Sequence, residues 1–363
     1  MKVLITYVSA GAGHKRVAEA IFDYLKTNRQ DLQLELVDIL PFANNFLRFC
    51  YNSGYPFLVH YAIWLWGFFF WMTEFGLTRW LSRKSALIVN YFGCRKFVTY
   101  LIKEKFDYII STHFLNSELA ANLKQKNKIQ AKLITVITDF GVHPFWVSSG
   151  TDLYVAASGL TGDKLLKMKV AEQKIQVSGI PFDSSFLKAQ NRVQLADKLG
   201  IKSGIFTVLV MTGSFGSGPL EEIAESLMGQ AQVLVVCARN KKLFVRLKER
   251  NLENVKVFGF VYNAEELMAV SDCIVTKPGG SSIAELLSME LLPIFIAAIP
   301  GQELVNEKVL ASYGVGSVAN NINEIKNQVL SLKNNPQRRE ALKQKIRQIQ
   351  KPFACKELAS VIR

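Results

Sequence analysis

The stretch that decides the fold is Val275–Asn306, VTKPGGSSIAELLSMELLPIFIAAIPGQELVN. Its pattern predicts, in order, a buried strand at 273–276, a glycine turn at 277–280, a helix at about 281–289, an apolar strand at 293–297 and a polar loop at 299–303. A strand, a turn and a helix in this order form the repeating unit of a parallel α/β sheet.

The glycine turn in this stretch predicts a phosphate site. Ser281 and Ser282 are residue types that cap helix N-termini, so we expect the helix to begin there. A helix start offers unpaired N–H groups and the positive end of the helix dipole to an anion. The alternative is an ordinary strand–helix connection. Four hydroxyl-binding side chains, placed where two adjacent loops converge, favour a ligand site: Glu285, Gln302, Glu303 and Asn306.

The first half of the chain repeats the alternation of strand and helix. Apolar strands are expected at 2–8, 34–37, 108–111, 133–137, 153–156 and 175–177. In parallel sheets, ligands bind beyond the carboxyl ends of the strands. His14, His113 and His143 fall at such ends, and Asp139 accompanies the last of them. From the residues alone, His14 is either a functional group at a small-residue turn or a helix-end residue without chemistry.

Composition points to an anionic partner and a reducing compartment. The 363 residues carry a formal charge of +14, which fits nucleic acid, acidic lipid or nucleotide phosphates. The five cysteines form no CxxC pair, which fits the cytoplasm better than a disulfide framework or a zinc site. Because residues 2–8 already form a strand pattern, we expect no signal peptide.

The segment Tyr55–Met72, YPFLVHYAIWLWGFFFWM, is apolar and unusually aromatic. Three interpretations compete: insertion into a membrane surface, a buried core helix, and a membrane span. Trp and Tyr favour the lipid headgroup region. Nearby basic residues face a single acid, Glu74: they are Arg48, Arg79, Arg83, Lys84, Arg95 and Lys96. An apolar aromatic segment flanked by positive charge favours the first interpretation.

The second half begins after a linker near 181–190. A strand from Phe206 leads into a second glycine loop, Thr212–Gly218, and this loop is either a flexible connection or a diphosphate contact. Further strands are expected at 233–237 and 255–258, and the basic Arg239 follows the first of them. The final stretch, 336–363, is helical and interrupted at Pro352, and we expect it to cross back to the first domain.

Seven motifs, in order along almost the whole chain, resemble glycosyltransferase family 28. They are SAGAGHKRVAEAI, TDFGVHPFW, MTGSFGSGP, CARNKKL, GFV, SDCIVTKPGGSSIAE and IPGQELVN. They are most similar to the branch of monogalactosyldiacylglycerol synthases and processive diacylglycerol glucosyltransferases. The resemblance implies an α/β fold of the GT-B type, two Rossmann-like domains facing across a cleft. The expected parts are an acceptor and membrane domain at 1–185, a donor domain at 190–345 and a returning helix at 346–363.

The resemblance also assigns residues to roles. His14 would be catalytic, with Asp139 as the rival base or as the group that orients His14. Glu285 would hold the ribose, and Gln302, Glu303 and Asn306 the sugar. The remaining donor residues would be Gly213, Ser214, Arg239, Phe260, Val261, Gly279, Gly280, Ser281 and Ser282. The acceptor and membrane residues would be Gly11, Gly13, His143, Trp146, Trp64, Trp66, Phe69 and Trp71.

The implied reaction is inverting transfer of galactose or glucose from a UDP-sugar to the free hydroxyl of 1,2-diacylglycerol. It would need no metal or other cofactor and would involve anionic lipid but no nucleic acid. The expected location is the cytoplasmic face of the cell membrane, as a peripheral protein. A lipid alcohol is a poor nucleophile, so a positioned base must accept its proton, and histidine does so near neutral pH.

Rival functions share the donor motifs. A lipid II synthase-like enzyme would transfer GlcNAc to an undecaprenyl-linked acceptor, and a UDP-sugar epimerase would need no membrane segment. A non-enzymatic UDP-sugar sensor would bind nucleotide without transfer. The chain departs from the resemblance at Leu291-Leu292-Pro293, where family members usually carry glycine before Leu-Pro. The choice of hexose, the number of sugars added, the activating lipid and the oligomeric state are left open by the sequence.

Overall fold

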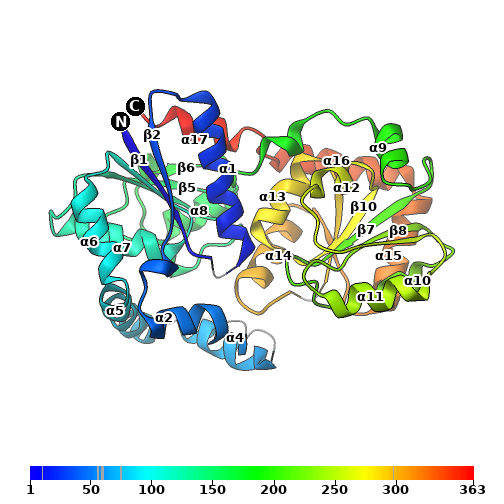
Figure 1. Cartoon of the computed structure of the whole chain (residues 1–363), viewed down its shortest axis with the longest axis horizontal. Coiled ribbons are helices and arrows are strands. Elements are labelled where there is room, and N and C mark those ends of the chain that lie inside the picture. Colours follow the sequence, from blue (N-terminus) through cyan, green and yellow to red (C-terminus); the bar gives the residue numbers. More distant parts are fainter. Residues whose placement is uncertain (10, 55–56, 59–60, 74–75, 297) are drawn as a thin grey trace. The chain divides into compact units, whose positions relative to one another are not determined.

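The computed structural model describes residues 1–9, 11–54, 57–58, 61–73, 76–296 and 298–363, with the backbone alone for 63, 69–70 and 76–81 (Figure 1). The chain divides into two compact units. Unit 1 contains Met1–Asp183, Ile299–Asn306 and Lys351–Arg363, and unit 2 contains Ser184–Ala298 and Glu307–Gln350. The segment Ile299–Asn306 thus groups with unit 1, whereas the sequence placed it in the second domain.

Unit 1 is built on a six-stranded parallel sheet in the order β2-β1-β3-β4-β5-β6. Its strands are β1 (Lys2–Tyr7), β2 (Gln33–Asp38), β3 (Tyr108–Ser111), β4 (Lys132–Val136), β5 (Leu153–Val155) and β6 (Ile175–Gln176). In register, Val3 of β1 lies beside Leu34 on one side and Tyr108 on the other. The chain therefore changes direction across the sheet between β1 and β3. In an open α/β sheet this switch point is where ligands bind.

The described helices of unit 1 connect and cover these strands (Figure 1). They are α1 (Ala12–Asn28), α2 (Asn45–Phe49), α4 (Ile63–Met72), α5 (Gly76–Gly93), α6 (Arg95–Glu104), α7 (Phe114–Gln125), α8 (Gly159–Lys167) and α17 (Ala354–Ser360). A π-helix spans Cys50–Gly54 and a 3-10 turn spans Pro144–Trp146. Helix α17 lies against α1 in unit 1, and the Arg29 guanidinium donates to the carbonyl of Ile362 at 2.9 Å.

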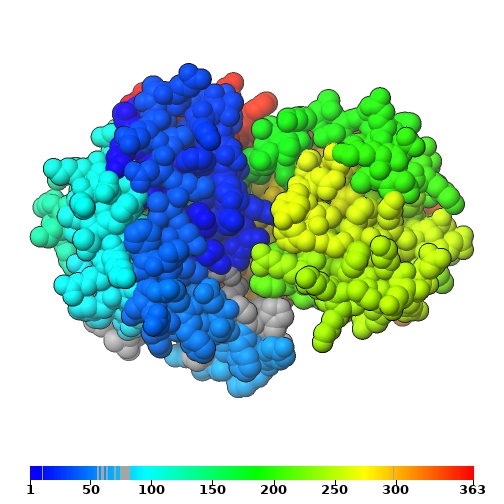
Figure 2. Space-filling view, viewed as in Figure 1, coloured from blue at the N-terminus to red at the C-terminus, as the bar shows by residue number. Residues whose placement is uncertain are grey.

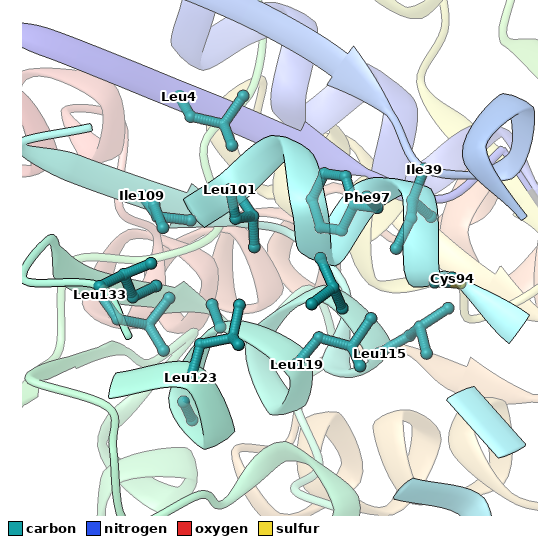
Figure 3. Close-up of a cluster of buried hydrophobic side chains, with 14 of the residues drawn as sticks. Leu4, Ile39, Cys94, Phe97, Leu101, Ile109, Leu115, Leu119, Leu123 and Leu133 are labelled. Atoms are coloured by element: carbon teal, nitrogen blue, oxygen red, sulfur yellow. The ribbon is translucent and has the colours of Figure 1, made fainter. Parts of the chain in front are cut away.

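The core of unit 1 lies between the sheet and helices α6 and α7 (Figure 3). Leu4, Ile109 and Leu133 point from β1, β3 and β4 toward Phe97 and other apolar side chains of the two helices. All four of these side chains are at most 1 % exposed. Burying one side chain of this size contributes about 1.5–3 kcal/mol, so this cluster holds the sheet and its helices in place.

Unit 2 has a second six-stranded parallel sheet, in the order β12-β11-β10-β7-β8-β9. Its strands are β7 (Thr207–Met211), β8 (Gln232–Val236), β9 (Val255–Phe258), β10 (Cys273–Thr276), β11 (Leu292–Phe295) and β12 (Ser317–Val318). The switch point here lies between β7 and β10. Its described helices are α9 (Arg192–Lys198), α10 (Leu220–Leu227), α11 (Lys241–Arg250), α12 (Ala264–Ala269), α13 (Gly280–Ser288), α14 (Gln302–Ser312), α15 (Ile322–Asn334) and α16 (Pro336–Ile349). Helix α14 begins in the part of the chain that groups with unit 1.

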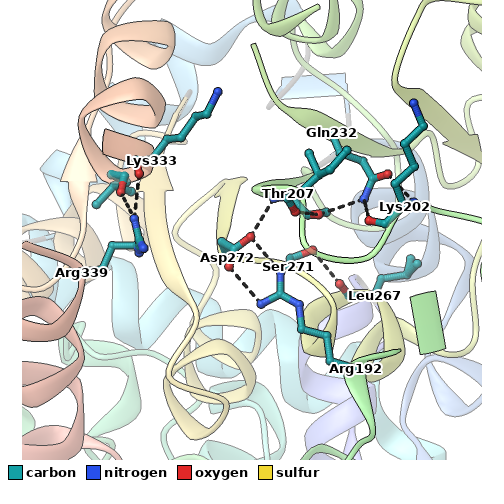
Figure 4. Close-up of polar contacts among 11 residues, drawn as sticks. Arg192, Lys202, Thr207, Gln232, Leu267, Ser271, Asp272, Lys333 and Arg339 are labelled. Carbon is teal, nitrogen blue, oxygen red and sulfur yellow. Dashed lines mark hydrogen bonds and ion pairs between the residues drawn. The ribbon is translucent and has the colours of Figure 1, made fainter. Parts of the chain in front are cut away.

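A polar network fixes the first helix of unit 2 to its sheet (Figure 4). The Asp272 carboxylate, just before β10, accepts two hydrogen bonds from the Arg192 guanidinium, at 2.8 and 3.0 Å. It also accepts one from the backbone N–H of Thr207 at 2.7 Å. Because a bidentate arginine–carboxylate pair fixes orientation as well as distance, α9 is held at the start of β7 and β10.

The α/β prediction with two parallel sheets is confirmed, and two local predictions are wrong. Helix α13 begins at Gly280 with Gly279 as its N-cap, so Ser281 and Ser282 lie inside the first turn and cap nothing. Glycine serves as an N-cap almost as well as serine, which explains the earlier start. The predicted polar loop at 299–303 is shorter than expected, because α14 already begins at Gln302.

Candidate active site

The turn after β1 leaves an open helix start in unit 1. Gly11 is the N-cap of α1, with extended backbone (φ −167°), and no side chain caps the helix. Gly13 lies in the first turn. A Cβ added at Gly11 would meet no atom of the described residues within 4 Å. The first N–H groups of α1 therefore face open space, where an anion or a hydroxyl can approach them.

His14 is held at the switch point of unit 1 by its Nδ1 atom. This nitrogen lies 2.8 Å from the carbonyl oxygen of Thr112 and 2.9 Å from the hydroxyl of Thr138. A carbonyl oxygen only accepts, so Nδ1 carries the proton and donates it to Thr112. The other ring nitrogen, Nε2, is then left with a lone pair. The loops after β1, β3 and β4 thus present one imidazole in the tautomer that accepts a proton at Nε2.

The surroundings keep His14 neutral. Burial lowers the pKa of His14 to about 4, and the hydrogen bond to the Thr112 carbonyl opposes this only in part. At neutral pH the ring is therefore uncharged and able to take up a proton. A bound anionic substrate would favour the protonated ring and raise this pKa during the reaction.

A second histidine, which is buried, lies against the half-buried His14. The ring centroids of His14 and His113 are 4.6 Å apart and nearly perpendicular, and Trp146 lies 6.3 Å from His14. His113 is 3 % exposed, and its Nδ1 accepts the N–H of Leu115 at the start of α7. Burial, with a smaller contribution from His14, holds the pKa of His113 well below its usual range. The sequence placed His113 at a strand end but gave it no role. The pairing follows from β1 and β3 being neighbours in the sheet.

Asp139 is a second candidate base at the end of β4. Burial raises the pKa of Asp139 to about 6, and a hydrogen bond from Asn306 opposes the shift. The Asn306 amide donates to the Asp139 carboxylate at 3.2 Å and accepts the N–H groups of Phe140 at 2.8 Å and Gly141 at 3.1 Å. Asn306 is fully buried. It therefore fixes the Asp139 loop, which differs from its expected role as a sugar ligand.

The aromatic segment is a surface helix in its described part. Residues 55–56 and 59–60 lie outside the described residues, as does the side chain of Phe69. In α4, Trp64 is 73 % exposed and Trp71 is 55 % exposed, so the buried-core interpretation is wrong for this helix. Trp66 is different, because its indole donates to the carbonyl of Pro300 at 3.0 Å and anchors α4 to unit 1.

Further exposed apolar side chains belong to the same unit, in which α2 and α4 lie at the surface in Figure 2 (blue and light blue). They come from α2 and α5, and those more than 40 % exposed are Phe46, Phe49, Ile88, Val89 and Phe92. The start of α2 is fixed to the end of α5, since the N–H of Asn44 donates to the Gly93 carbonyl at 2.7 Å. Among the helices that the structure describes, none is both long and apolar enough to cross a membrane.

His143 is half-buried and Trp146 is buried in this unit. The Nδ1 of His143 accepts the N–H of Phe145 at 3.3 Å, and its Nε2 lies 2.9 Å from the hydroxyl of Thr73, just after α4. Trp146 is 2 % exposed. Both had been expected to contact acceptor or membrane. Because Trp146 is buried, its ring packs near His14 and does not contribute to the surface of the unit.

The glycine loop after β7 has a fixed shape in unit 2. Gly213, Gly216 and Gly218 have positive φ angles of 85°, 61° and 118°. A Cβ at Gly216 would overlap the carbonyl group of Cys237, whereas one at Gly213 would meet no described atom within 4 Å. The loop is thus packed on one side and open at Gly213, as a loop that receives a phosphate must be.

Residues from two neighbouring strand ends join this loop. The N–H of Arg239 donates to the carbonyl of Ser214 at 3.3 Å, so the loops after β7 and β8 touch. The Arg239 guanidinium lies 5.9 Å from the ring of Phe260, which follows β9. Phe260 is 42 % exposed, and Val261 beside it is half-buried. A cation and an accessible aromatic face suit a phosphate and a nucleobase, respectively.

The loop after β10 contacts the glycine loop after β7 on the other side of the switch point. The Lys277 ammonium donates to the hydroxyl of Ser217 at 3.1 Å, which connects the loops after β10 and β7. Gly279 caps α13 without a side-chain hydrogen bond, and a Cβ there would meet no described atom within 4 Å. The start of α13 therefore offers free N–H groups next to the glycine loop of β7.

The remaining predicted donor residues differ in accessibility. Glu285 lies on the buried face of α13 and is only 4 % exposed. The Glu303 carboxylate accepts the N–H of Ile299 at 2.8 Å, which connects the first turn of α14 to the loop before it, and Gln302 beside it is half-buried. Within the described residues, no group of three His, Cys, Asp or Glu side chains is arranged to hold a metal ion.

Comparison with known proteins gives matches to both halves of the chain. Residues 14–182 match the family model described as monogalactosyldiacylglycerol (MGDG) synthase. Residues 207–358 match that of the glycosyltransferase family 28 C-terminal domain. A processive diacylglycerol beta-glucosyltransferase of Staphylococcus epidermidis is 27 % identical, with 99 % of this chain and 93 % of the relative aligned.

Solved structures share the fold. MurG of Acinetobacter baumannii has a TM-score of 0.64 at 14 % identity, with 99 % of each chain covered. UDP-GlcNAc 2-epimerase of Neisseria meningitidis, bound to UDP-GlcNAc, has a TM-score of 0.63 at 11 % identity, again with 99 % of each chain covered. At these identities the likeness establishes the GT-B fold and does not separate transferases from epimerases.

Proposed function

The chain belongs to glycosyltransferase family 28, in the branch of the diacylglycerol glycosyltransferases, and from this premise we propose that it transfers a hexose from a UDP-sugar to 1,2-diacylglycerol. The product is a monoglycosyldiacylglycerol. The observation that carries the proposal is the imidazole of His14 at the switch point of unit 1, which is neutral and fixed through Nδ1, so that its Nε2 carries a lone pair.

His14 is the general base in this proposal. The free hydroxyl of diacylglycerol gives its proton to Nε2 while its oxygen forms a bond to the anomeric carbon of the sugar. The bond between that carbon and the diphosphate oxygen breaks, and its electron pair leaves with UDP. Attack from the opposite face inverts the anomeric configuration. The Thr112 carbonyl supports the reaction, because it holds the Nδ1–H and stabilises the imidazolium that forms.

Unit 2 holds the donor in this proposal. The open backbone at Gly213, the start of α13 after Gly279, and the side chains of Lys277 and Arg239 surround the carboxyl ends of β7, β8 and β10. Backbone N–H groups and cations stabilise the charge that develops on departing UDP, so the reaction needs no metal ion. Phe260 offers a partly exposed ring to the base.

The exposed aromatic side chains of α4 hold unit 1 at the membrane surface where diacylglycerol resides. Trp64 and Trp71 are exposed and suit the headgroup region. The neighbouring Arg48 and Lys84, both exposed, would be attracted to anionic lipid at the cytoplasmic face. The enzyme is then a peripheral membrane protein.

One assay tests the whole proposal. The protein is incubated with UDP-glucose or UDP-galactose and with vesicles containing diacylglycerol and phosphatidylglycerol, and the lipids are then analysed by mass spectrometry. We expect one hexose on diacylglycerol from one of the two donors. Release of free or epimerised sugar nucleotide without glycolipid, or no consumption of either donor, would refute it.

A further inference from the structure

His113 is a buried polar ring that the proposed reaction does not use. It follows β3 at the switch point of unit 1, where His14 follows β1. The centroids of the two rings are 4.6 Å apart, and the ring planes are nearly perpendicular. A molecule of a few atoms bound at His14 can therefore also reach His113.

The hydrogen bond of the His113 ring decides which of its nitrogens carries the proton. Nδ1 accepts the backbone N–H of Leu115 at 3.1 Å and so caps the start of α7. A ring nitrogen that accepts a hydrogen bond carries no proton. Because burial also holds the pKa of His113 well below its ordinary value, the ring is neutral and its one proton is on Nε2. His14 is the opposite tautomer, with its proton on Nδ1 and a lone pair on Nε2.

The Nε2–H group of His113 is an open donor. Within the described part of the chain, no acceptor makes a hydrogen bond with it. It is also not among the unpaired side-chain atoms of that part which are closed off from solvent, so the exposed 3 % of His113 includes this nitrogen. Polar groups at buried positions are almost always paired. An open donor on His113 beside the lone pair of His14 therefore indicates a ligand with an acceptor and a donor of its own.

Neighbouring groups hold the His113 ring in one orientation. The ring of Phe114 is stacked on it, with the centroids 4.2 Å apart and the planes at 30°. Tyr51, from the π-helix Cys50–Gly54, lies 6.0 Å away and nearly perpendicular to it. The His113 backbone is fixed as well, since its carbonyl accepts the hydroxyl of Ser111 at 2.8 Å. A donor that is fixed before the ligand arrives loses little freedom on binding, which suits a recognition role.

The acceptor of the proposed reaction carries the two groups that this histidine pair can bind. In 1,2-diacylglycerol, the carbon with the free hydroxyl is bonded to the carbon that carries the second ester. The hydroxyl can donate to Nε2 of His14. The ester carbonyl has no proton and can only accept, as the Nε2–H of His113 requires. A glycerol diether has the same hydroxyl but no carbonyl beside it.

We propose that His113 is a specificity-determining residue whose Nε2–H binds the ester carbonyl next to the free hydroxyl of the acceptor lipid. This hydrogen bond turns the hydroxyl toward Nε2 of His14. His113 keeps its proton throughout, so it binds the acceptor and is not a second base. The inference rests on the proposed function, because it concerns the acceptor of that reaction, but it does not depend on the choice of hexose or on membrane binding.

Two variants separate the tasks of the two ring nitrogens. His113→Asn keeps an acceptor near the position of Nδ1, and asparagine caps helices well, but it has no donor at the position of Nε2. His113→Gln places an N–H group near the position of Nε2 and leaves the N–H of Leu115 without its cap. We therefore expect His113→Gln to lower the melting temperature more than His113→Asn does.

His143→Asn is the matched control. The Nδ1 of His143 also accepts an N–H two residues further on, that of Phe145, so asparagine replaces the same kind of cap. Its Nε2, in contrast, already lies 2.9 Å from the hydroxyl of Thr73. The control thus repeats the chemical change of His113→Asn at a ring whose second nitrogen is paired within the protein.

The measurement is hexose transfer in detergent micelles to two lipids of equal chain length, 1,2-dioctanoylglycerol and 1,2-di-O-octylglycerol. The readout is the ratio of kcat/KM for the diester to kcat/KM for the diether. We expect wild-type protein to favour the diester about two- to tenfold, the contribution of one hydrogen bond. The ratio should fall toward one in His113→Asn and stay at the wild-type value in His113→Gln and His143→Asn. A merely structural role would slow transfer to both lipids by the same factor and leave the ratio unchanged.

Mixed lipids test the same inference with wild-type protein alone, whether or not the variants fold. A glycerol with its ester only on the carbon next to the free hydroxyl should be used as well as the diester. One with its ester only on the far carbon should be used as poorly as the diether. Equal use of all four lipids, or an unchanged ratio in folded His113→Asn, would overturn the inference and leave the proposed function standing. Absence of transfer to every lipid would refute the proposed function, and the inference with it.

Discussion

Asn306 offers the sharpest test of how the candidate site is built. Its amide makes three hydrogen bonds with the Asp139 loop, to Phe140 N, Gly141 N and the Asp139 carboxylate. Asn306→Ala leaves all three groups without this partner at a fully buried position. Each unsatisfied buried group costs about 1–3 kcal/mol, so we expect stability to fall by about 2–5 kcal/mol after partial rehydration.

The same substitution should shift the pH dependence of the reaction. The pKa of Asp139 is about 6 because burial raises it, while the Asn306 N–H stabilises the carboxylate. Removing that donor raises the pKa further. A hydrogen bond to a charged group contributes about 1.5–3 kcal/mol, which equals about one to two pH units. If the ionised carboxylate takes part, the acid limb of kcat/KM should move upward by that amount, with activity recovered at higher pH.

Two further variants separate the shift of the acid limb of kcat/KM from a loss of stability alone. Asn306→Asp keeps oxygen atoms for the N–H groups of Phe140 and Gly141 but places a carboxylate against Asp139, so its acid limb should move still higher. Val305→Ala removes a side chain that packs on Gly141 but leaves the Asn306 amide, so it should lower stability with an unshifted limb. An unchanged acid limb in folded Asn306→Ala protein would refute the proposed positioning of Asp139.

Asp139 also predicts how stability varies with pH. Its pKa in the folded protein, about 6, lies above the ordinary value of 3.8, so protonation favours the folded state. The stabilisation is complete below pH 3.8 and is lost as the pH rises through 6. The loss is at most about 3 kcal/mol, at 1.36 kcal/mol per pH unit. In chemical denaturation of the Asp139→Asn variant, the free energy of unfolding should not show this decline as the pH rises through 6.

Four other outcomes are expected. His14→Ala should lower kcat by about 10²–10⁴-fold with UDP affinity unchanged, and near-normal turnover would assign the base role to Asp139. Gly216→Ala should destabilise unit 2 by about 1–3 kcal/mol in denaturant titration because of its positive φ and its contact with Cys237, whereas Gly213→Ala should mainly weaken UDP binding in calorimetry. Trp64→Ser with Trp71→Ser should lower vesicle affinity by about 10²–10⁴-fold, since each exposed indole loses about 1.5–3 kcal/mol of burial. EDTA should leave turnover unchanged, and recovery only with added metal would contradict the metal-free mechanism.

Strands were the part of the fold most accurately predicted from the sequence. The bounds of β3, β9 and β10 agree with those expected, and the other predicted strands lie within one or two residues. Most of them are short apolar runs ended by glycine or by polar residues, so local pattern and tertiary position agree. The helix starts were less accurate, as at Gly279, because several residue types serve equally well as caps.

The segment Ile299–Asn306 shows what a sequence pattern cannot predict. Its residues read as a polar loop of the donor domain, but the structure packs Pro300 against α4 and Val305 against Gly141. Such contacts join residues more than 150 positions apart and leave no local signal. Asn306 looks like an exposed hydroxyl ligand in the sequence, and only tertiary contacts show that it is buried.

The two switch points explain why the candidate site could still be predicted in outline. In unit 1, the loops after β1 and β3 meet through His14, Thr112 and His113, and in unit 2 the loops after β7 and β10 meet through Ser217 and Lys277. Both meetings follow from strand order alone, since the first strand of each sheet has the next strand of the chain on one side and a later strand on the other. A polar residue directly after such a strand is therefore brought to the site whatever the loop sequence. Residues further along a loop or helix, such as Asn306, depend on packing, and their roles have to be read from the structure.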